Sequence, residues 1–318
     1  MLLPIDVSVV VCTYNRAPSL GLTLRSLDVQ VTPPDLTWEV VVVDNNSADA
    51  TRTVVDAFAA TARIRVRYRF EPRQGLSHAR NTGIAHARGA ILAFTDDDVR
   101  PGPDWVAGLT RVLRETGADI VGGRILPAWD HPPPPWLVAR PFLRGPLAIM
   151  EHAVPGPVVE ATGIPNVWGA NMAFRREVFD RVGLFDPRRG VTGRKLYRGE
   201  EVELVRRALA AGCRVVYDPR VVVWHRIAAG RIRRRYISRL YFDWAEGNVL
   251  AQAPPPGRLL LGVPPSLYRR AAHRLGGWLW AAARQRPDTL DRWLESCEAA
   301  GCVWGLWKHR FKGPARPS

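Results

Sequence analysis

The first hundred residues alternate between strand patterns and helical patterns. Val7–Cys12 and Trp38–Val43 are valine-rich runs without strict alternation, which is typical of strands buried on both faces. Ser19–Asp28 lies between them and has leucines at helical spacing. The further elements that we expect in this region are helices at Thr51–Ala62 and Leu76–Arg88 and strands at Ile64–Arg69 and Ala90–Thr95. This rhythm predicts an α/β fold with a mostly parallel sheet and helices on both faces.

Polar side chains gather where three of these strands end. Thr13–Arg16, Asp44–Ser47 and Asp96–Asp98 each follow a predicted strand. Ligands of open parallel sheets bind at the carboxyl ends of the strands, so we expect these clusters to line one site. Three adjacent carboxylates repel one another, and a hard divalent cation such as Mg²⁺ or Mn²⁺ would neutralise them and bridge to substrate phosphates. An isolated acidic triplet is as readily a solvated turn, but its place at a strand end in an arginine-rich chain favours a metal site.

The rest of the chain is less regular. The proline-rich stretch Pro127–Pro146 is incompatible with regular helix or central strand, and we predict a surface excursion beside the acceptor. Beyond it, the expected elements are helices at Arg176–Val182 and Glu201–Ala211 and a strand at Arg214–Tyr217.

After His225 the composition shifts to arginine, tryptophan and proline. We therefore predict a catalytic domain at residues 1–225, with a nucleotide-binding half at 1–100 and an acceptor-binding half at 101–225. A basic, tryptophan-rich helical appendage would then occupy residues 226–318.

The chain carries a formal net charge of +15, which predicts attraction to polyanions. No apolar run is long enough to span a bilayer, and the N-terminus lacks the features of a signal peptide. We expect a cytoplasmic protein, with peripheral attachment to the cytoplasmic face of the membrane as an alternative location.

Two interpretations of the appendage fit its pattern. Between Trp278 and Trp307, tryptophans are interleaved with basic residues, as in interfacial helices on anionic lipid. Alternatively, the tryptophans pack on the catalytic domain and the arginines are solvated.

Eight segments of the first 225 residues resemble successive signatures of the family-2 glycosyltransferases, in the order and approximate spacing of that family. They are Val7–Arg16 (VSVVVCTYNR), Val41–Ser47 (VVVDNNS), Gly75–Gly89 (GLSHARNTGIAHARG), Ala93–Asp98 (AFTDDD), Trp168–Arg175 (WGANMAFR), Val182–Asp186 (VGLFD), Gly199–Leu204 (GEEVEL) and Val223–His225 (VWH). Each segment alone is weakly specific, whereas the ordered set is specific.

The resemblance implies a GT-A fold, which is a Rossmann-like sheet flanked by helices. It implies transfer of a sugar, of the hexosyltransferase type, from a nucleotide-diphosphate donor to an acceptor hydroxyl with inversion. A UDP-sugar is the expected donor, and Mn²⁺ or Mg²⁺ the expected cofactor. The expected acceptor is a glycan or a lipid-linked sugar of polysaccharide or glycolipid assembly, with an anionic membrane surface as a further candidate partner and no nucleic acid.

The resemblance also assigns roles to single residues. Donor binding falls to Thr13, Arg16, Asp44, Arg80, Asp96 and Asp97; metal binding to Asp98, Asp96 and His225; and acceptor binding to Trp168 and Asn171. Simpler roles also fit three of these residues: a turn for Asp44, a structural role for His225, as is more common for a lone histidine, and a core position for Trp168.

The general base is expected at the start of the helix that contains Glu200 and Glu201, where relatives carry Glu-Asp. Glu201 occupies the position of the aspartate and reaches about one methylene further, so we favour Glu201, with Glu200 as the alternative. Both residues would also complement the dipole at a helix N-terminus.

Two other function classes share some of these features. A nucleotidyltransferase also combines an α/β sheet with metal-binding carboxylates, but a glycine-rich phosphate loop would be expected near its first strand, and Thr13–Ser19 contains no glycine. A nucleic-acid-binding protein would explain the charge and the aromatic residues. It would have no evident need for carboxylates at strand ends.

Overall fold

The computed structural model describes residues 5–152, 154–160, 167–193, 195–250, 252 and 259–310. The chain divides into two compact units, Met1–Pro187 with Glu200–Ala228, and Arg188–Gly199 with Ala229–Ser318. The division at Ala228 lies close to the predicted boundary after residue 225. The segment Arg188–Gly199, which we expected in the catalytic domain, belongs to the second unit.

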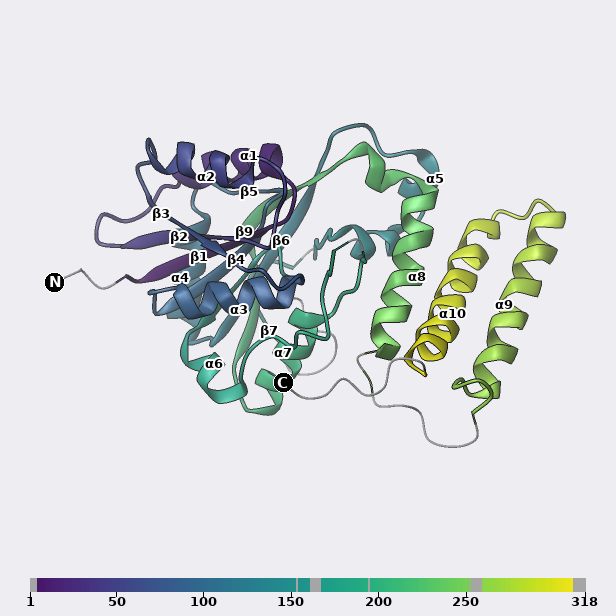
Figure 1. Ribbon diagram of the computed structural model, residues 1–318. Helices are drawn as coiled ribbons and strands as arrows, with labels where there is room; N and C mark the ends of the chain where they lie inside the picture. Colours follow the sequence, from purple (N-terminus) through teal and green to yellow (C-terminus); the bar gives the residue numbers. More distant parts are fainter. Residues whose placement is uncertain are drawn as a thin grey trace. The chain divides into compact units, whose positions relative to one another are not determined.

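The strands of the first unit form one mixed sheet. Within the described residues its nine strands follow the order β3-β2-β1-β4-β8-β6-β9-β5, and β7 pairs with β9 (Figure 1). Their bounds are β1 Val7–Thr13, β2 Trp38–Asp44, β3 Arg65–Phe70, β4 Ile91–Asp96, β5 Val99–Pro101, β6 Ile120–Trp129, β7 Val158–Glu160, β8 Met172–Arg175 and β9 Val215–Ile227. Strands β1 to β4 are parallel, whereas β8 runs antiparallel to β4 and β6. The predicted α/β sheet is confirmed.

Helices cover both faces of this sheet. Their bounds are α1 Ala17–Asp28, α2 Thr51–Ala59, α3 Leu76–His86, α4 Trp105–Thr116, α5 Pro135–Val138, α6 Glu177–Val182 and α7 Glu200–Ala210. Alternate residues of a strand point to opposite faces. Val9 therefore joins a core with α1, α2 and α4, whereas Val10 joins a second core with α3, α6 and α7.

Two expectations about the later chain were wrong. The stretch 127–146 begins inside β6, and it contains the short helix α5. Pro127 is tolerated in β6 because β8 pairs with β6 only as far as Gly122. At Pro127 the neighbouring strand is β9, and this part of β6 lies outside the centre of the sheet. Strand β9 continues well beyond Tyr217 and includes His225. The remaining predicted elements are present with small differences at their ends.

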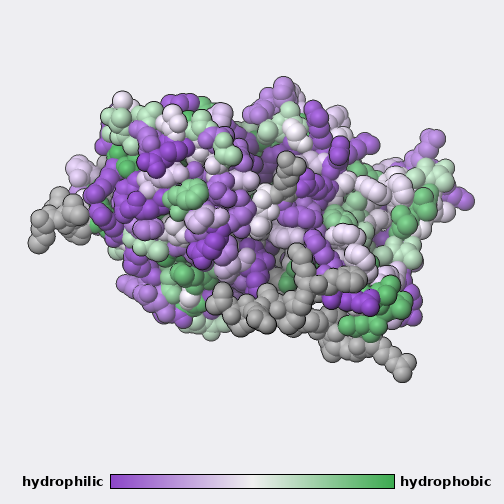
Figure 2. All heavy atoms as spheres, viewed as in Figure 1, coloured by the Kyte–Doolittle hydropathy of each residue, from purple (hydrophilic) through white to green (hydrophobic). Residues whose placement is uncertain are grey.

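The second unit is helical, as expected. A short turn at Ala229–Ile232 precedes α8 (Arg234–Leu250), α9 (Pro265–Ala283) and α10 (Thr289–His309). The rings of Trp278 and Trp293 lie 4.7 Å apart, so tryptophans of α9 and α10 pack on each other. Hydrophobic residues also reach the surface beside the start of α9 (Figure 2). None of the described helices is both long enough and apolar enough to cross a membrane.

A closed charge cluster joins the 188–199 segment to α8. Lys195 Nζ lies 3.0 Å from Asp243 Oδ1 and 2.5 Å from Glu246 Oε2. Lys308 of α10 and Tyr197 donate to the second oxygen of Glu246, at 3.2 and 3.0 Å. Asp243 and Glu246 are fully buried, so this cluster keeps its carboxylates away from water, whereas the side chains of Lys195 and Lys308 are 34% and 33% exposed.

Candidate active site at the strand ends

The three polar strand ends lie at one edge of the sheet. In the register of the parallel strands, Thr13 is opposite Asp44, and Cys12 is opposite Asp96. Strands β1, β2 and β4 are adjacent, so the register places their last residues side by side. The sheet therefore brings together the residues that the sequence placed at separate strand ends.

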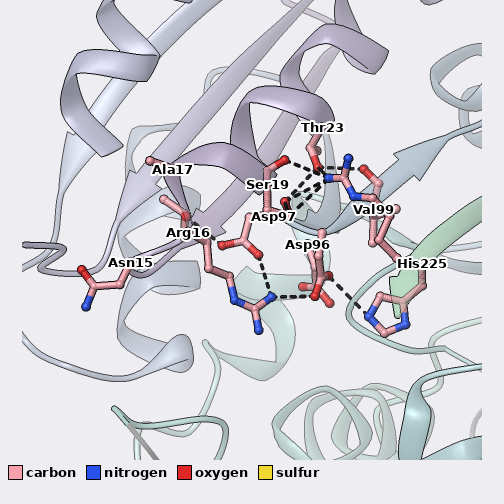
Figure 3. Close-up of polar contacts among 12 residues, drawn as sticks. Asn15, Arg16, Ala17, Ser19, Thr23, Asp96, Asp97, Val99 and His225 are labelled. Carbon is pink, nitrogen blue, oxygen red and sulfur yellow. Dashed lines mark hydrogen bonds and ion pairs between the residues drawn. The ribbon is translucent and has the colours of Figure 1, made fainter. Parts of the chain in front are cut away.

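Arg16 and Thr13 hold the acidic triplet. Arg16 Nη1 lies 2.6 Å from Asp98 Oδ2 and 3.2 Å from Asp97 Oδ1, and Thr13 Oγ1 donates to Asp97 Oδ2 at 2.7 Å (Figure 3). Burial raises the pKa of Asp97 to about 7, although the charge of Arg16 acts in the opposite direction. The guanidinium thus offsets part of the repulsion between these carboxylates.

The backbone of the triplet is fixed by α1 and β9. Ser19 and Thr23 of α1 donate their hydroxyls to the carbonyl oxygen of Asp97, at 2.9 and 3.0 Å (Figure 3). The amide of Arg226 donates to the carbonyl of Asp98 at 2.8 Å. These bonds position the carboxylates without using their side-chain oxygens.

His225 reaches Asp98 from β9. The antiparallel pair of β5 and β9 places His225 opposite Val99, and its Nε2 lies 3.4 Å from Asp98 Oδ1 (Figure 3). A carboxylate oxygen and an imidazole nitrogen side by side are a donor pair that a divalent metal accepts. Among the described residues, no three His, Cys, Asp or Glu side chains converge as a metal site. The pair therefore fits a metal that completes its shell with phosphate oxygens and water, as Mg²⁺ commonly does.

A buried arginine links this edge to the start of α7. Arg80 Nη1 donates to Glu200 Oε1 at 2.7 Å, and Arg80 Nη2 lies 3.8 Å from Asp96 Oδ1. Space for the guanidinium comes from Gly169, where an added Cβ would lie 2.1 Å from Arg80 Nη2. The glycine of the WGAN segment thus admits this arginine. The sequence pointed to Arg80 for donor binding but not to its pairing with Glu200.

The two glutamates at the start of α7 have different surroundings. Glu200 is buried, and one of its oxygens is bonded to Arg80, whereas Oε2 has no hydrogen-bond partner among the described residues. Glu201 is half-buried. Both residues lie in the first turn of α7, where negative charge also complements the helix dipole.

Asp44 forms the turn that its sequence suggested. Its Oδ1 accepts from the amide of Ser47 at 2.9 Å, and its Oδ2 accepts from the Tyr68 hydroxyl at 2.8 Å. Burial and the contact with Asp44 raise the pKa of Tyr68 to about 12, which keeps this phenol protonated as a donor. Tyr68 is a neighbour of the site that we did not predict, since strand residues with alternating exposure give no such signal.

The two predicted acceptor residues do not join the carboxylates. Asn171 is fully buried, and its amide connects Trp105 Nε1 at 2.8 Å with the carbonyls of Arg124 and Val221 at 2.9 and 3.0 Å. Asn171 thus joins parts of the core. Trp168 is partly buried and packs against the core, and its role at the acceptor stays a prediction.

Comparisons with known proteins agree with the architecture of this site. The family model described as "Glycosyl transferase family 2" matches residues 8–183. The chain is 31% identical over 243 residues to the glucosyl-dolichyl phosphate glucuronosyltransferase of Haloferax volcanii, covering 75% of this chain and 72% of that protein. It is 39% identical over 120 residues to the glycosyltransferase AglE of the same organism, covering 37% of this chain and 39% of that protein.

Two solved structures share the fold. The mannosyltransferase PcManGT of Pyrobaculum calidifontis, in complex with GDP-Man and Mn²⁺, superposes with a TM-score of 0.63 at 22% identity, covering 96% of this chain and 90% of that chain. GalNAc-T7 with UDP, GalNAc and Mn²⁺ superposes with a TM-score of 0.55 at 19% identity, covering 79% of this chain and 52% of that chain. Both similarities support a GT-A architecture.

Proposed function

Since this chain belongs to glycosyl transferase family 2, and is thus a glycosyltransferase, we propose that it transfers a sugar from a nucleotide-diphosphate donor to an acceptor hydroxyl. We propose inversion at the anomeric carbon and a UDP-sugar as the first donor to test. The observation that carries this proposal is the meeting of Arg16, Asp98 and His225 at the carboxyl edge of the sheet. A diphosphate and a divalent cation complement this arrangement of charges.

On the donor side, Asp98 and His225 would hold Mn²⁺ or Mg²⁺. When bound, the ion would supply Lewis-acid stabilisation of the diphosphate leaving group. Arg16 is half-exposed beside these groups, and its fixed positive charge would favour the negative charge that develops on the departing nucleotide. Asp44, at the end of the neighbouring strand, is proposed to contact the base, in addition to its bond with Ser47.

On the acceptor side, we assign the general base to Glu201. Glu200 is buried and held by Arg80 at 2.7 Å, whereas Glu201 is half-buried and thus more accessible to an acceptor. Glu201 would take the proton of the acceptor hydroxyl while its oxygen attacks the anomeric carbon. A single displacement of this kind inverts the configuration. Arg80 serves as a positioning residue, because it contacts both Glu200 and Asp96.

The reaction class is tested by product analysis. The full chain is incubated with UDP- and GDP-sugars, and separately with nucleoside triphosphates and sugar phosphates, in Mn²⁺ or in EDTA. We expect release of a nucleoside diphosphate from a nucleotide sugar in the presence of Mn²⁺ and not in EDTA. Release of pyrophosphate from a triphosphate, with no nucleoside diphosphate formed, would instead identify a nucleotidyltransferase.

We also propose a lipid-linked acceptor, handled at an anionic membrane surface. A relative with 31% identity is named for a dolichyl phosphate substrate. In the second unit, α9 exposes Leu275, Leu279 and Trp280 at 45%, 54% and 46%. Arginine guanidiniums surround the Trp280 ring at 5.1 to 5.8 Å; they belong to Arg284, Arg286 and Arg292. Exposed leucine and tryptophan beside arginine suit the interface of an anionic bilayer.

Vesicle co-sedimentation tests this attachment. We expect the chain to sediment with anionic vesicles at low salt, less at high salt, and not with neutral vesicles. The double change Leu275→Ser and Leu279→Ser should abolish sedimentation. Leu22→Ser, at a leucine of α1 with 46% exposure, is the matched control and should not. No sedimentation of the wild-type chain at either salt concentration would remove this part of the proposal.

A further inference from the structure

The first unit contains an apolar pocket that the proposed chemistry does not use. It has a volume of about 220 Å³ and lies between the end of β6 and the proline-rich segment that follows. Its apolar walls include Pro127, Trp129, Leu137, Val138 and Leu147. An engineered apolar cavity of roughly 150 Å³ is large enough to hold benzene. This pocket therefore has room for several carbon atoms of a chain or for one ring.

The register of the sheet places this pocket beside the candidate site. Strands β6 and β9 are parallel, and Pro127 is opposite His225. Residues in register on adjacent strands project from the same face of a sheet, and the strands lie about 4.8 Å apart. Pro127 thus lines the pocket from the face on which His225 approaches Asp98, at 3.4 Å. The wall of the pocket at Pro127 therefore lies one strand away from His225.

The charged residues of the pocket select the kind of molecule. Arg140 and Arg144 line it together with the single acidic residue Glu151. Arg144 lies 3.7 Å from Glu151, and its side chain is 59% exposed. The two guanidiniums that line the pocket would attract an anionic group of a ligand. The apolar walls of the pocket would bind a hydrocarbon group. An amphiphile with a phosphate next to an apolar chain satisfies both requirements.

We propose that this pocket binds the first isoprenyl or alkyl carbons of a lipid-phosphate acceptor, with its phosphate against Arg140 and Arg144. This inference rests on the proposed function and specifies its acceptor as a lipid that carries a phosphate. The volume holds only the start of such a chain. Val138 lines the pocket and is 64% exposed, so the remainder of the chain leaves toward solvent or a bilayer on that side.

Calorimetric titration with short probes tests the pocket directly. The probes are geranyl phosphate, which combines both features, and geraniol and inorganic phosphate, which each carry one. We expect geranyl phosphate to bind at least tenfold more tightly than either of the others. Equal binding of inorganic phosphate would mean a phosphate site only, and equal binding of geraniol would mean an apolar site only; either result overturns the proposal.

Two variants locate the binding. Val138→Asp places a carboxylate at an exposed wall position and should weaken geranyl phosphate binding at least tenfold. Arg144→Gln should weaken geranyl phosphate several-fold and leave geraniol unchanged. Val31→Asp, at a valine of the same unit with 66% exposure, is the matched control and should bind as wild type. Unchanged binding in Val138→Asp would contradict the assignment.

The Leu275→Ser, Leu279→Ser protein is a control for adsorption of the probe to α9. It should still bind geranyl phosphate.

The outcome is separable from that of the proposed function. Binding of UDP or GDP in Mn²⁺ is measured on the same proteins, and we expect Val138→Asp to retain it. Loss of both ligands in Val138→Asp, with an unchanged unfolding curve, would show that the pocket is not a separate subsite. Geranyl phosphate binding without any nucleotide binding would leave the pocket in place and defeat the sugar-transfer proposal.

Discussion

The two units each contain a cluster of buried carboxylates, and the clusters differ in how their charge is balanced. At the strand edge of the first unit, Asp97 and Asp98 share the half-exposed guanidinium of Arg16. In the second unit, Asp243 and Glu246 are bonded to two lysines, Lys195 and Lys308, and both carboxylates are fully buried.

The charge balance of the first cluster suits it to binding a ligand, whereas that of the second suits it to stabilising the fold. Adjacent carboxylates beside a half-exposed guanidinium attract further positive charge, and the side chain of Asp96 is 36% exposed beside them. The second cluster satisfies its charges internally and joins three segments of the chain. We therefore expect changes at the first cluster to alter catalysis and changes at the second to alter folding.

The largest expected effect is that of Asp98→Asn. Loss of a proposed metal ligand should reduce sugar transfer by roughly 10³-fold or more, which corresponds to about 4 kcal/mol. The unfolding free energy should stay the same or rise, since one of three adjacent carboxylates loses its charge. Steady-state transfer rates and urea unfolding measure the two quantities. Unchanged transfer would contradict the assignment of Asp98.

Glu246→Gln should show the opposite pattern. Removing the charge of the buried Glu246 takes a carboxylate partner from both Lys195 and Lys308, although Lys195 keeps Asp243, and we expect a loss of about 4 kcal/mol in the unfolding free energy of the second unit. Affinity for a nucleoside diphosphate in Mn²⁺ should not change. If nucleotide affinity falls while the unfolding curve is unaltered, the division between the two clusters is wrong.

Glu71 sharpens the comparison through pH. It is buried, and hydrogen bonds from Arg73 lower its pKa to about 2, against the opposing effect of burial and with help from Thr82. A carboxylate whose pKa is lower in the folded than in the unfolded state stabilises the fold fully at pH values above its unfolded pKa, near 4.3. This stabilisation is lost as the pH falls through the folded pKa, about 2. Glu71→Gln should therefore lower the unfolding free energy at pH 7 by about 2 kcal/mol.

The pH dependence is the decisive part of this prediction. Urea unfolding of wild type and Glu71→Gln is compared at pH 7, 5 and 3, and the difference should shrink between pH 5 and 3. A difference that stays constant over this range would mean that the charge of Glu71 does not carry the effect.

The smallest effect is expected at an exposed pair. Arg52 and Asp56 form an i,i+4 pair with exposed side chains on α2. Water and salt screen such pairs, so Asp56→Asn should unfold like wild type within experimental error. A clear destabilisation would show that exposure is a poor guide to the value of charge pairs in this protein.

The sheet and the strand-end clusters were predictable because their signals are local. Runs such as Val7–Cys12 identify buried strands, and parallel order then brings Thr13, Asp44 and Asp96 to one edge. The resemblance to family-2 glycosyltransferases added roles to these positions. The family and the fold are confirmed, whereas the individual roles remain predictions that the variants test.

The contacts that were not predicted join distant parts of the chain. Arg80 and Glu200 are 120 residues apart in sequence, and nothing local to either residue indicates the pair. Asn171 was assigned to the acceptor by the resemblance, and no local pattern indicates its bond with Trp105 in the core. Pro127 was expected to end regular structure, and it remains in β6 because β8 no longer pairs at that point.

The central claim is that Asp98 and His225 bind a divalent metal together with the diphosphate of a nucleotide. Isothermal titration of UDP and GDP into the wild-type chain and into Asp98→Asn, each in Mn²⁺ and in EDTA, tests it most directly. The account predicts that one nucleotide binds the wild-type chain at least tenfold more tightly in Mn²⁺ than in EDTA, and that Asp98→Asn abolishes this gain. Equal affinity of the wild-type chain in Mn²⁺ and EDTA, or a gain that persists in Asp98→Asn, would contradict it.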